Sequence, residues 1–192
     1  MPVGDCENAF FEAARKRGVQ LVRYKKPWLN QRGHFGLPDS ASAVALPLEQ
    51  IFTLLGGNVA EQSAKRLTPL PGDFMHEETG TLIEVDEMQH FTSFRLQTFS
   101  CYGVDSPLGY DVDEYASICK RYARSADKYR QTKPAIAFGI GGRQRQRAYY
   151  DALRDLATPA MGHPPLVRVP AVDGNGKAAF ERNRERILDA LG

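Results

Sequence analysis

Two acidic residues, Asp73 and Glu84, have the type and spacing to share one chemical site. The polar stretch 76–80 (HEETG) separates two strand-like segments and ends in glycine, which predicts a hairpin. The arms of that hairpin bring positions 73 and 84 near each other. Two carboxylates held together repel unless a proton or a cation lies between them. Mg²⁺ or Mn²⁺ suits all-oxygen ligands, and the Val85 carbonyl is a candidate third oxygen. The plain alternative is a surface hairpin with scattered acids.

Two further residues follow on the second arm. Asp86 is two positions after Glu84, so on a strand both side chains share a face and are expected to point at the same site. His90 stands just beyond, after Gln89. A single histidine is often structural, but next to these acids His90 is a candidate for catalysis or for supporting a metal.

Charge is distributed unevenly along the chain, although the net charge is only +2. Residues 67–94 contain no Lys or Arg but six acids, whereas residues 120–150 contain nine bases and one acid, a local net charge of +8. An acidic centre beside a basic band fits a metal site that acts on a polyanion. Two ordinary solvated faces of opposite sign would give the same pattern.

Composition narrows the class of protein. The 192 residues are 42% hydrophobic and 25% charged, as in soluble globular domains, and no run of 18 apolar residues predicts a membrane span. The first residues lack the basic segment of a signal peptide. Cys6, Cys101 and Cys119 are odd in number and form no CxxC pair, which favours free thiols in a reducing cytoplasm. A cysteine nucleophile stays open as an alternative.

The elements that must position these residues alternate between helix and strand, which predicts an α/β (α+β) fold with a small mixed sheet. Residues 25–40 carry two prolines and two glycines and are expected to form a loop, and residues 134–140 a strand or a buried loop. The tyrosines near 150 are expected in the core, as aromatic residues at helical spacing usually are, with stacking on bases of single-stranded nucleic acid as the alternative. Helices are expected at 5–17, 47–55, 111–129, 143–157 and 176–191, and strands at 19–24, 66–75, 81–86 and 166–169.

The acidic motif resembles the core of the PD-(D/E)XK, or restriction-endonuclease-like, nuclease superfamily. It is nearest the branch of the very-short-patch-repair endonucleases and their uncharacterised relatives. The resemblance covers about 45–172, with an insertion at about 93–140. The residues that carry it are Asp73-Phe74, then Glu84-Val85-Asp86-x-x-Gln89-His90, then Asp151-Ala-Leu-Arg154-Asp155 on a helix, and Leu166-Val-Arg168-Val169-Pro170 after it.

This chain departs from the family pattern at three places. The usual Pro-Asp is here Pro71-Gly72-Asp73, and the glycine after the acidic pair is Glu87. The superfamily's lysine is missing, and its position holds Asp86. That substitution leaves open which group activates water and whether the protein cleaves its substrate.

The resemblance implies a Mg²⁺- or Mn²⁺-dependent endonuclease that hydrolyses phosphodiester bonds in DNA. Asp73, Glu84 and the Val85 carbonyl would hold the metal, and His90 or Asp86 would orient or deprotonate the nucleophile. The expected supporting residues, each of which has an ordinary surface role as its alternative, are Glu49 on the short helix before the hairpin, Glu87, Gln89, and Arg95 or Arg154 as the cation that stabilises the phosphate.

A single domain is expected, made of an N-terminal extension (1–40), a nuclease-like core (45–92 and 141–172), a basic helical insertion (93–140) and a C-terminal helix (176–192). Nucleic acid, expected to be DNA, is the implied partner, and a homodimer stays open. The alternatives are a non-catalytic nucleic-acid-binding protein of the same fold, or an unrelated α/β protein with an interaction role, in which Asp73 and Glu84 would lie far apart. The bases expected to contact phosphates are Arg121, Arg124, Lys128, Arg130, Arg143, Arg145 and Arg147.

Overall fold

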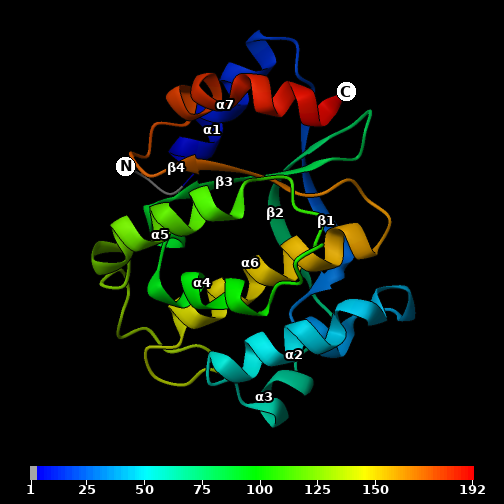
Figure 1. The fold of residues 1–192 in the computed structure, drawn as a ribbon, viewed down its shortest axis with the longest axis vertical. Helices are drawn as coiled ribbons and strands as arrows, with labels where there is room; N and C mark the ends of the chain where they lie inside the picture. Colours follow the sequence, from blue (N-terminus) through cyan, green and yellow to red (C-terminus); the bar gives the residue numbers. More distant parts are fainter. Residues whose placement is uncertain (1–3) are drawn as a thin grey trace.

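A mixed four-stranded sheet lies between two groups of helices in the computed structural model, which describes residues 4–192 (Figure 1). The fold is α+β, as the sequence predicts. The strands are β1 (Leu21–Asn30), β2 (Pro69–His76), β3 (Leu82–Glu87) and β4 (Val167–Ala171). The α-helices are α1 (Asp5–Lys16), α2 (Ala45–Leu54), α3 (Val59–Ser63), α4 (Ser93–Thr98), α5 (Val112–Ala126), α6 (Arg143–Ala160) and α7 (Gly176–Leu191). Short 3-10 helices are Gly33–Gly36, Asp39–Val44, Met88–His90 and Phe99–Cys101.

The strands lie in the order β1-β2-β3-β4. The β2–β3 pair is the antiparallel hairpin that the sequence predicts, with Phe74 opposite Ile83 and Gly80 in the turn at a φ of 72°. A positive φ is what glycine adopts without steric cost. β4 runs parallel to β3 with Glu84 opposite Arg168, and the connection between them contains α4, α5 and α6. A parallel pair needs such a long crossover.

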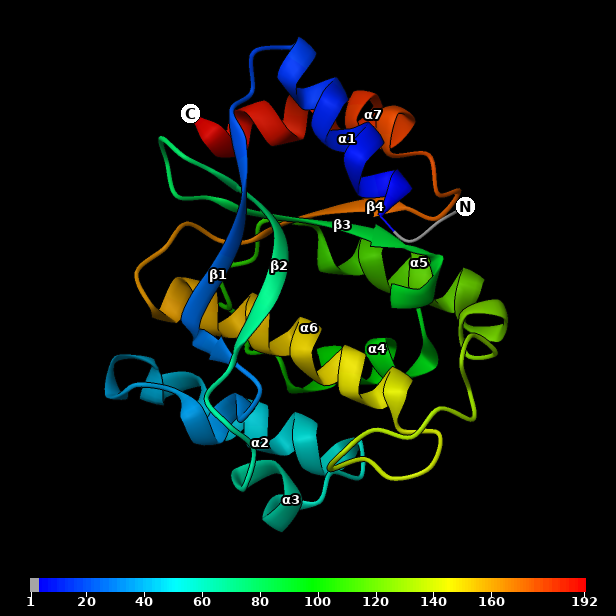
Figure 2. The ribbon, with the colours of Figure 1, turned by 180° about the vertical axis from the view of Figure 1, so that it is seen from behind.

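Each face of the sheet has its own apolar core. On one face α1 and α7 pack against each other and bury Phe10, Phe180 and Val85 (Figure 2). On the other face α2 and α6 enclose a larger core that includes Phe52 and Tyr149. The tyrosines near 150 therefore belong to the core, as expected.

Local sequence signals begin and end most helices. Gly18, at a φ of 82°, follows the end of α1, and the Asp111 side chain caps α5 by accepting hydrogen bonds from the Asp113 and Glu114 amides. The Asn175 side chain caps α7 in the same way. The five predicted helices are confirmed, and α3 and α4, which are five and six residues long, are additional.

The prediction of a loop from residue 25 is wrong as far as Asn30, because β1 continues to that residue. β1 is an edge strand with irregular pairing between Lys25 and Asn30, and such an edge tolerates Pro27. The N-terminal residues expected as an extension therefore supply a strand of the central sheet. Residues 134–140 form a loop, with an isolated bridge between Ala135 and Gly139.

The segment expected as an insertion is packed against the core. Its helices α4 and α5 enclose a third apolar cluster around Phe91, Tyr110, Tyr115 and Cys119. All three cysteines are free thiols, and two of them are buried. No helix within residues 4–192 is long and apolar enough to cross a membrane.

Candidate functional site

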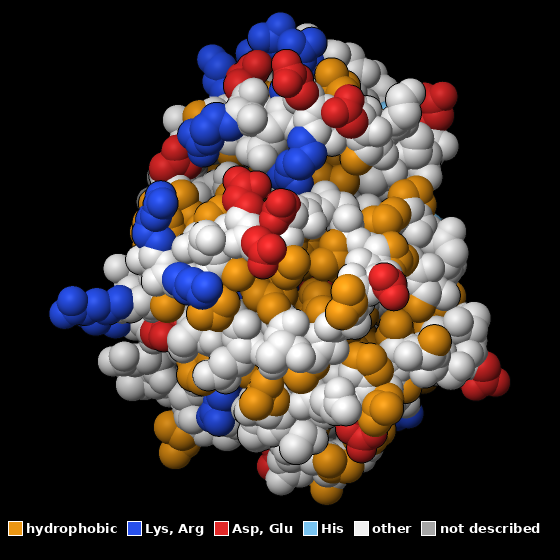
Figure 3. All heavy atoms as spheres, viewed as in Figure 1, with side chains coloured by type: hydrophobic (Ala, Val, Ile, Leu, Met, Phe, Trp, Pro, Cys, Tyr) orange, Lys and Arg blue, Asp and Glu red, His pale blue; other side chains and the backbone are white. Residues whose placement is uncertain are grey.

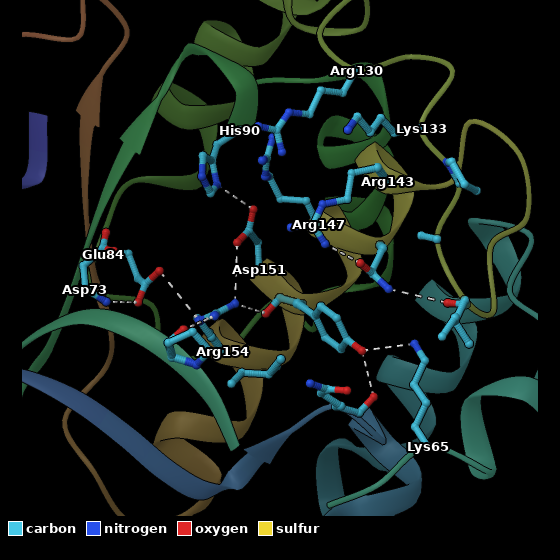
Figure 4. A pocket seen from close by; sticks show the side chains of 18 residues that line it. Lys65, Asp73, Glu84, His90, Arg130, Lys133, Arg143, Arg147, Asp151 and Arg154 are labelled. Atoms are coloured by element: carbon cyan, nitrogen blue, oxygen red, sulfur yellow. Dashed lines mark hydrogen bonds and ion pairs between the residues drawn. The ribbon is translucent and has the colours of Figure 1, made fainter. Parts of the chain in front are cut away.

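A cavity of about 670 Å³ opens beside the β2–β3 hairpin. Its walls come from β2 and β3, from one face of α6, from loop residues 130–136, and from the segments that carry Gln31 and Lys65 (Figure 4). Both acidic and basic side chains line it. The acids are Asp73, Glu84 and Asp151, and the bases are Lys65, Arg130, Lys133, Arg143, Arg147 and Arg154.

Asp73 and Glu84 are neighbours at one end of this cavity. The Asp73 amide donates to Glu84 Oε1 at 3.1 Å, and the Val85 amide donates to Asp73 Oδ2 at 2.8 Å. The predicted juxtaposition is confirmed, and the wide separation expected for an accidental arrangement is not found. In a strand the N–H and C=O of one residue point to the same neighbouring strand, so the Val85 carbonyl also faces β2.

Gly72 explains the interrupted Pro-Asp motif. The ring of Tyr24 on β1 lies where a side chain at position 72 would stand, and a Cβ there would be 1.8 Å from Tyr24 Cζ. This approach lets the buried Tyr24 hydroxyl donate to Glu84 Oε1 at 2.5 Å. The glycine thus makes room for a residue that orients one carboxylate of the pair.

The two carboxyl groups of the acidic pair are close enough to repel each other when both are ionised. Burial, followed by the charge of Glu84, raises the pKa of Asp73 well above its usual value of 3.8. The Glu84 carboxyl is shielded, with 7% of its side chain exposed, and the Asp73 side chain is 19% exposed. A proton or a cation between the two groups would relieve the repulsion.

The donor chemistry fits Mg²⁺ or Mn²⁺. Within residues 4–192 no group of three or more His, Cys, Asp or Glu side chains is arranged to hold a metal ion. A site for Zn²⁺ needs three or four such ligands, whereas Mg²⁺ is commonly held by one or two carboxylates together with water and substrate phosphates. Asp73 and Glu84, with the Val85 carbonyl, match the second kind of site.

Arg154 projects from α6 toward the acidic pair (Figure 4). Its Nε lies 3.6 Å from Glu84 Oε2, its Nη2 donates to the Pro71 carbonyl at 2.7 Å, and its Nη1 donates to the Tyr150 carbonyl at 3.1 Å. The two carbonyls fix the guanidinium, while its buried Nε has no hydrogen-bond partner among the described residues. Arg154 is therefore a held cation with an unused donor beside the carboxylates.

His90 lines the cavity and is held by two carboxylates. Its Nδ1 lies 2.9 Å from Asp151 Oδ2 and 3.1 Å from Asp86 Oδ1. Burial would raise the pKa of Asp151, but His90 and Arg168 lower it well below its usual range. Because an ionised carboxylate only accepts hydrogen bonds, Nδ1 is the donor in these contacts.

Asp86 does not line the cavity, although it was expected to share a site with Glu84. Only 1% of it is exposed, and both of its carboxylate oxygens accept hydrogen bonds from Arg168 Nη1, at 3.0 and 2.9 Å. The Tyr115 hydroxyl donates to it at 2.6 Å. Asp86 therefore reaches the cavity only through His90, as a positioning residue.

Two expected phosphate-stabilising or metal-supporting residues lie elsewhere. Arg95 is fully buried and bonds to Asp155, Tyr102 and Tyr110, away from the cavity, because its planar fork satisfies a carboxylate sixty positions further along the chain. Glu49 is exposed on α2 and does not line the cavity. Both expectations are corrected by the packing of the helices.

The supporting pair Glu87 and Gln89 lies just outside the cavity. The Gln89 side chain donates to Glu87 Oε2 at 3.1 Å, and the Gln89 carbonyl accepts from Arg147 Nη1 at 3.1 Å. The backbone carbonyl of Gln89 thus helps to position Arg147, one of the bases that line the cavity.

Three of the seven bases expected to bind phosphates line the cavity: Arg130, Arg143 and Arg147. Arg145 instead donates to the Phe138 and Ile140 carbonyls. The other expected bases do not line it; they are Arg121, Arg124 and Lys128. On the face that carries α4 and α5, Lys and Arg side chains stand apart and form no continuous patch (Figure 3).

Several lining residues were not singled out from the sequence as site residues. Tyr150 and Asp151 are two of these, and their spacing on α6 places them on one helical face with the predicted bases Arg143, Arg147 and Arg154. No pattern in the sequence around Lys65 indicates that this residue lines the cavity. Loop 130–136 is fixed by Ala137, at a φ of 74°, whose amide donates to Glu61 Oε2 at 2.7 Å.

Comparison with known proteins gives one similarity. Residues 50–135 are similar to a family of unknown function (DUF7255). That stretch is less than half of the chain and contains the β2–β3 hairpin and His90, but not α6 or β4. No curated protein and no solved structure matches the chain.

Proposed function

We propose that this protein is a metal-dependent nuclease that hydrolyses phosphodiester bonds, with DNA as its substrate, on a restriction-endonuclease-like core. The observation that carries the proposal is the arrangement of charge in one cavity. A close carboxylate pair, Asp73 and Glu84, lies at one end, and bases line the rest of the wall. A substrate phosphate bound together with a divalent cation would compensate both sets of charges, the cation at the acidic pair and the phosphate at the bases.

The connectivity supports the same core. The hairpin carries the two acids, α6 follows with Asp151 and Arg154, and β4 lies parallel to β3. This is the order of elements that the resemblance implies.

Each residue of the site would have its own role in phosphodiester hydrolysis. Asp73, Glu84 and the Val85 carbonyl would hold Mg²⁺ or Mn²⁺, which when bound supplies an activated water and stabilises the leaving oxygen. His90, fixed through Nδ1, would accept a proton from the attacking water at Nε2. Arg154, held beside the acidic pair by two backbone carbonyls, would stabilise the negative charge that develops on the phosphate.

A non-catalytic nucleic-acid-binding protein of the same fold is the second candidate, and one observation favours it. Asp86 occupies the position of the superfamily's lysine and is committed to Arg168, while Arg154 already lies 3.6 Å from Glu84. These two arginines neutralise part of the acidic charge without a metal ion.

Cleavage assays separate the two candidates. Supercoiled plasmid and end-labelled single strands would be incubated with Mg²⁺ or Mn²⁺ and with EDTA, using wild type, Glu84→Gln and Glu78→Gln. Glu78 is an exposed acid in the same hairpin turn and serves as the matched control. We expect metal-dependent cleavage that Glu84→Gln reduces by about 100-fold or more, a loss typical of removing a group that stabilises the transition state. Glu78→Gln should cleave like wild type.

Cleavage that survives in Glu84→Gln would contradict the proposed site. Salt-sensitive binding without any cleavage by wild type would favour the non-catalytic candidate.

A further inference from the structure

Five of the six bases that line the cavity have no acidic partner among residues 4–192. Arg154 lies within 4.0 Å of Glu84 and Asp151. The other five (Lys65, Arg130, Lys133, Arg143 and Arg147) form no ion pair with any carboxylate of residues 4–192. Uncompensated cations that face one concave space indicate an anionic ligand.

Two of these bases are also partly removed from water. Burial lowers the pKa of Lys65 to about 8, and the charge of Glu61 offsets this only in part. Lys65 Nζ donates to Gln62 Oε1 at 2.7 Å and to the Tyr150 hydroxyl at 3.2 Å, so one of its three N–H donors is unused. Burial likewise lowers the pKa of Arg147, whose Nη1 donates only to a neutral carbonyl. A phosphate would offset the cost of holding both cations there.

Arg143 and Arg147 are displaced along α6 from Arg154, which lies beside the acidic pair. Arg143 and Arg154 are three helical turns apart, or roughly 16 Å along the axis at 1.5 Å per residue. Lys65 meets the helix at Tyr150, across the cavity from Asp73 and Glu84 (Figure 4). Successive phosphates of a stacked strand are about 3.4 Å apart along the axis, so this distance spans several nucleotides. One phosphate cannot contact both ends.

We propose that Lys65, Arg143 and Arg147 form a phosphate subsite separate from the Asp73–Glu84 pair, and that the ligand is a single strand of nucleic acid. The strand would place one phosphate at the acidic pair and a second at this subsite. A volume of about 670 Å³ holds about one or two nucleotides at a time, so the strand between the two phosphates would be only partly enclosed. A duplex carries its phosphates on the outside of a rigid rod and cannot enter a concave site of this size. The inference rests on the proposed function only for the role of the first phosphate.

Binding without metal tests the subsite independently of cleavage. A fluorescein-labelled 12-nucleotide DNA strand, and the duplex of the same sequence, would be titrated in EDTA at several salt concentrations and followed by fluorescence anisotropy. The proteins would be wild type, Lys65→Gln, Lys65→Arg, Arg147→Gln, and Arg121→Gln. Arg121 is exposed on α5 outside the cavity and controls for the loss of one positive charge. Thermal unfolding of each variant would check that it is folded.

We expect the single strand to bind at least tenfold more tightly than the duplex. Lys65→Gln and Arg147→Gln should each weaken binding roughly five- to tenfold and reduce the slope of log K against log salt by about 0.7, the value for one lost contact to a single strand. Lys65→Arg should restore most of the affinity, and Arg121→Gln should bind like wild type.

If Arg121→Gln lost as much affinity for the single strand as Lys65→Gln and Arg147→Gln, the attraction would be diffuse and the subsite would be overturned. The absence of any binding by wild type would overturn it as well. Duplex binding as tight as single-strand binding would overturn the choice of ligand. If these variants behave as expected but wild type never cleaves, only the proposed nuclease function fails. If wild type cleaves through Glu84 while Lys65→Gln and Arg147→Gln bind normally, only the subsite fails.

Discussion

Asp155 is the residue whose neutralisation should damage this structure most. Its Oδ1 accepts from Arg168 Nε at 2.6 Å. Its Oδ2 accepts from Arg95 Nη2 and from the hydroxyls of Tyr102 and Tyr110, at 2.6 and 2.7 Å. Burial would raise the pKa of Asp155, but Arg168 and Arg95 lower it. One carboxylate with 1% exposure therefore compensates two guanidinium groups that are themselves fully buried.

The Asp155→Asn substitution keeps the shape of the side chain and removes its charge. Breaking a buried ion pair by removing one partner costs about 3–5 kcal/mol, because the remaining charge is left uncompensated in a dry site. Part of the carboxylate's acceptor capacity also becomes an NH₂ group facing donors. Since a domain is stable by only about 5–15 kcal/mol, this loss is a large fraction of the total. At about 2–4 °C per kcal/mol for a chain of this length, we expect Tm to fall by about 6–20 °C.

Urea unfolding at pH 7, followed by circular dichroism, would measure the free energy of unfolding. Asp105→Asn is the control, because Asp105 is exposed and takes part in no side-chain hydrogen bond or ion pair among the described residues. A loss below about 1 kcal/mol for Asp155→Asn, within the range of ordinary surface changes, would refute the reasoning. The double variant Arg95→Met, Asp155→Asn should lose less stability than the two single losses added together, since the groups contact each other.

Three further predictions follow from the site and the thiols. In EDTA, the free energy of unfolding of wild type should fall as pH rises from about 3.8 through the raised folded-state pKa of Asp73, by at most about 1.4 kcal/mol per pH unit. Asp73→Asn should lack this fall, and Mg²⁺ should raise the Tm of wild type but not of this variant. Thermal unfolding from pH 4 to 9, with and without Mg²⁺, would measure both effects. Gly72→Ala should displace the Tyr24 ring from Glu84, lower stability by about 1–3 kcal/mol and reduce cleavage, while Gly192→Ala at the chain end should change neither. Cys6 and Cys119, whose pKa values burial raises to about 11 and about 12, should resist Ellman's reagent at pH 8 in the native protein, so that only Cys101 reacts until urea exposes all three; rapid reaction of all three thiols in the native state would contradict this.

The parts of this fold that the sequence predicts are those that short-range signals determine. The hairpin follows from a polar turn that ends in Gly80, and its register alone brings Asp73 beside Glu84. The helices follow from apolar spacing with Gly18 and Asp111 at their ends. These features depend on residues within about a dozen positions of one another.

The errors lie where distant segments meet. β1 extends past Lys25 because it pairs with β2, which begins about forty residues further on. Arg95 was expected in the site, yet its partner Asp155 comes from α6 and holds it in the core. Lys65 is held at the cavity wall by a hydrogen bond to the hydroxyl of Tyr150, a residue eighty-five positions away. No local pattern encodes such pairs, because each depends on how the helices pack on the sheet.

The surroundings of Asp86 suit an acid and not the lysine that the resemblance would imply at this position. Asp86 accepts from Arg168 on β4 and from Tyr115 on α5, so it joins the helical insertion to the strand that carries Glu84. A lysine there would place a second cation against the fully buried Arg168 and leave that arginine with less compensation. The electrostatics of this core therefore require an acid at position 86. The same acid lies 3.1 Å from Nδ1 of His90 and so helps to position that ring at the cavity.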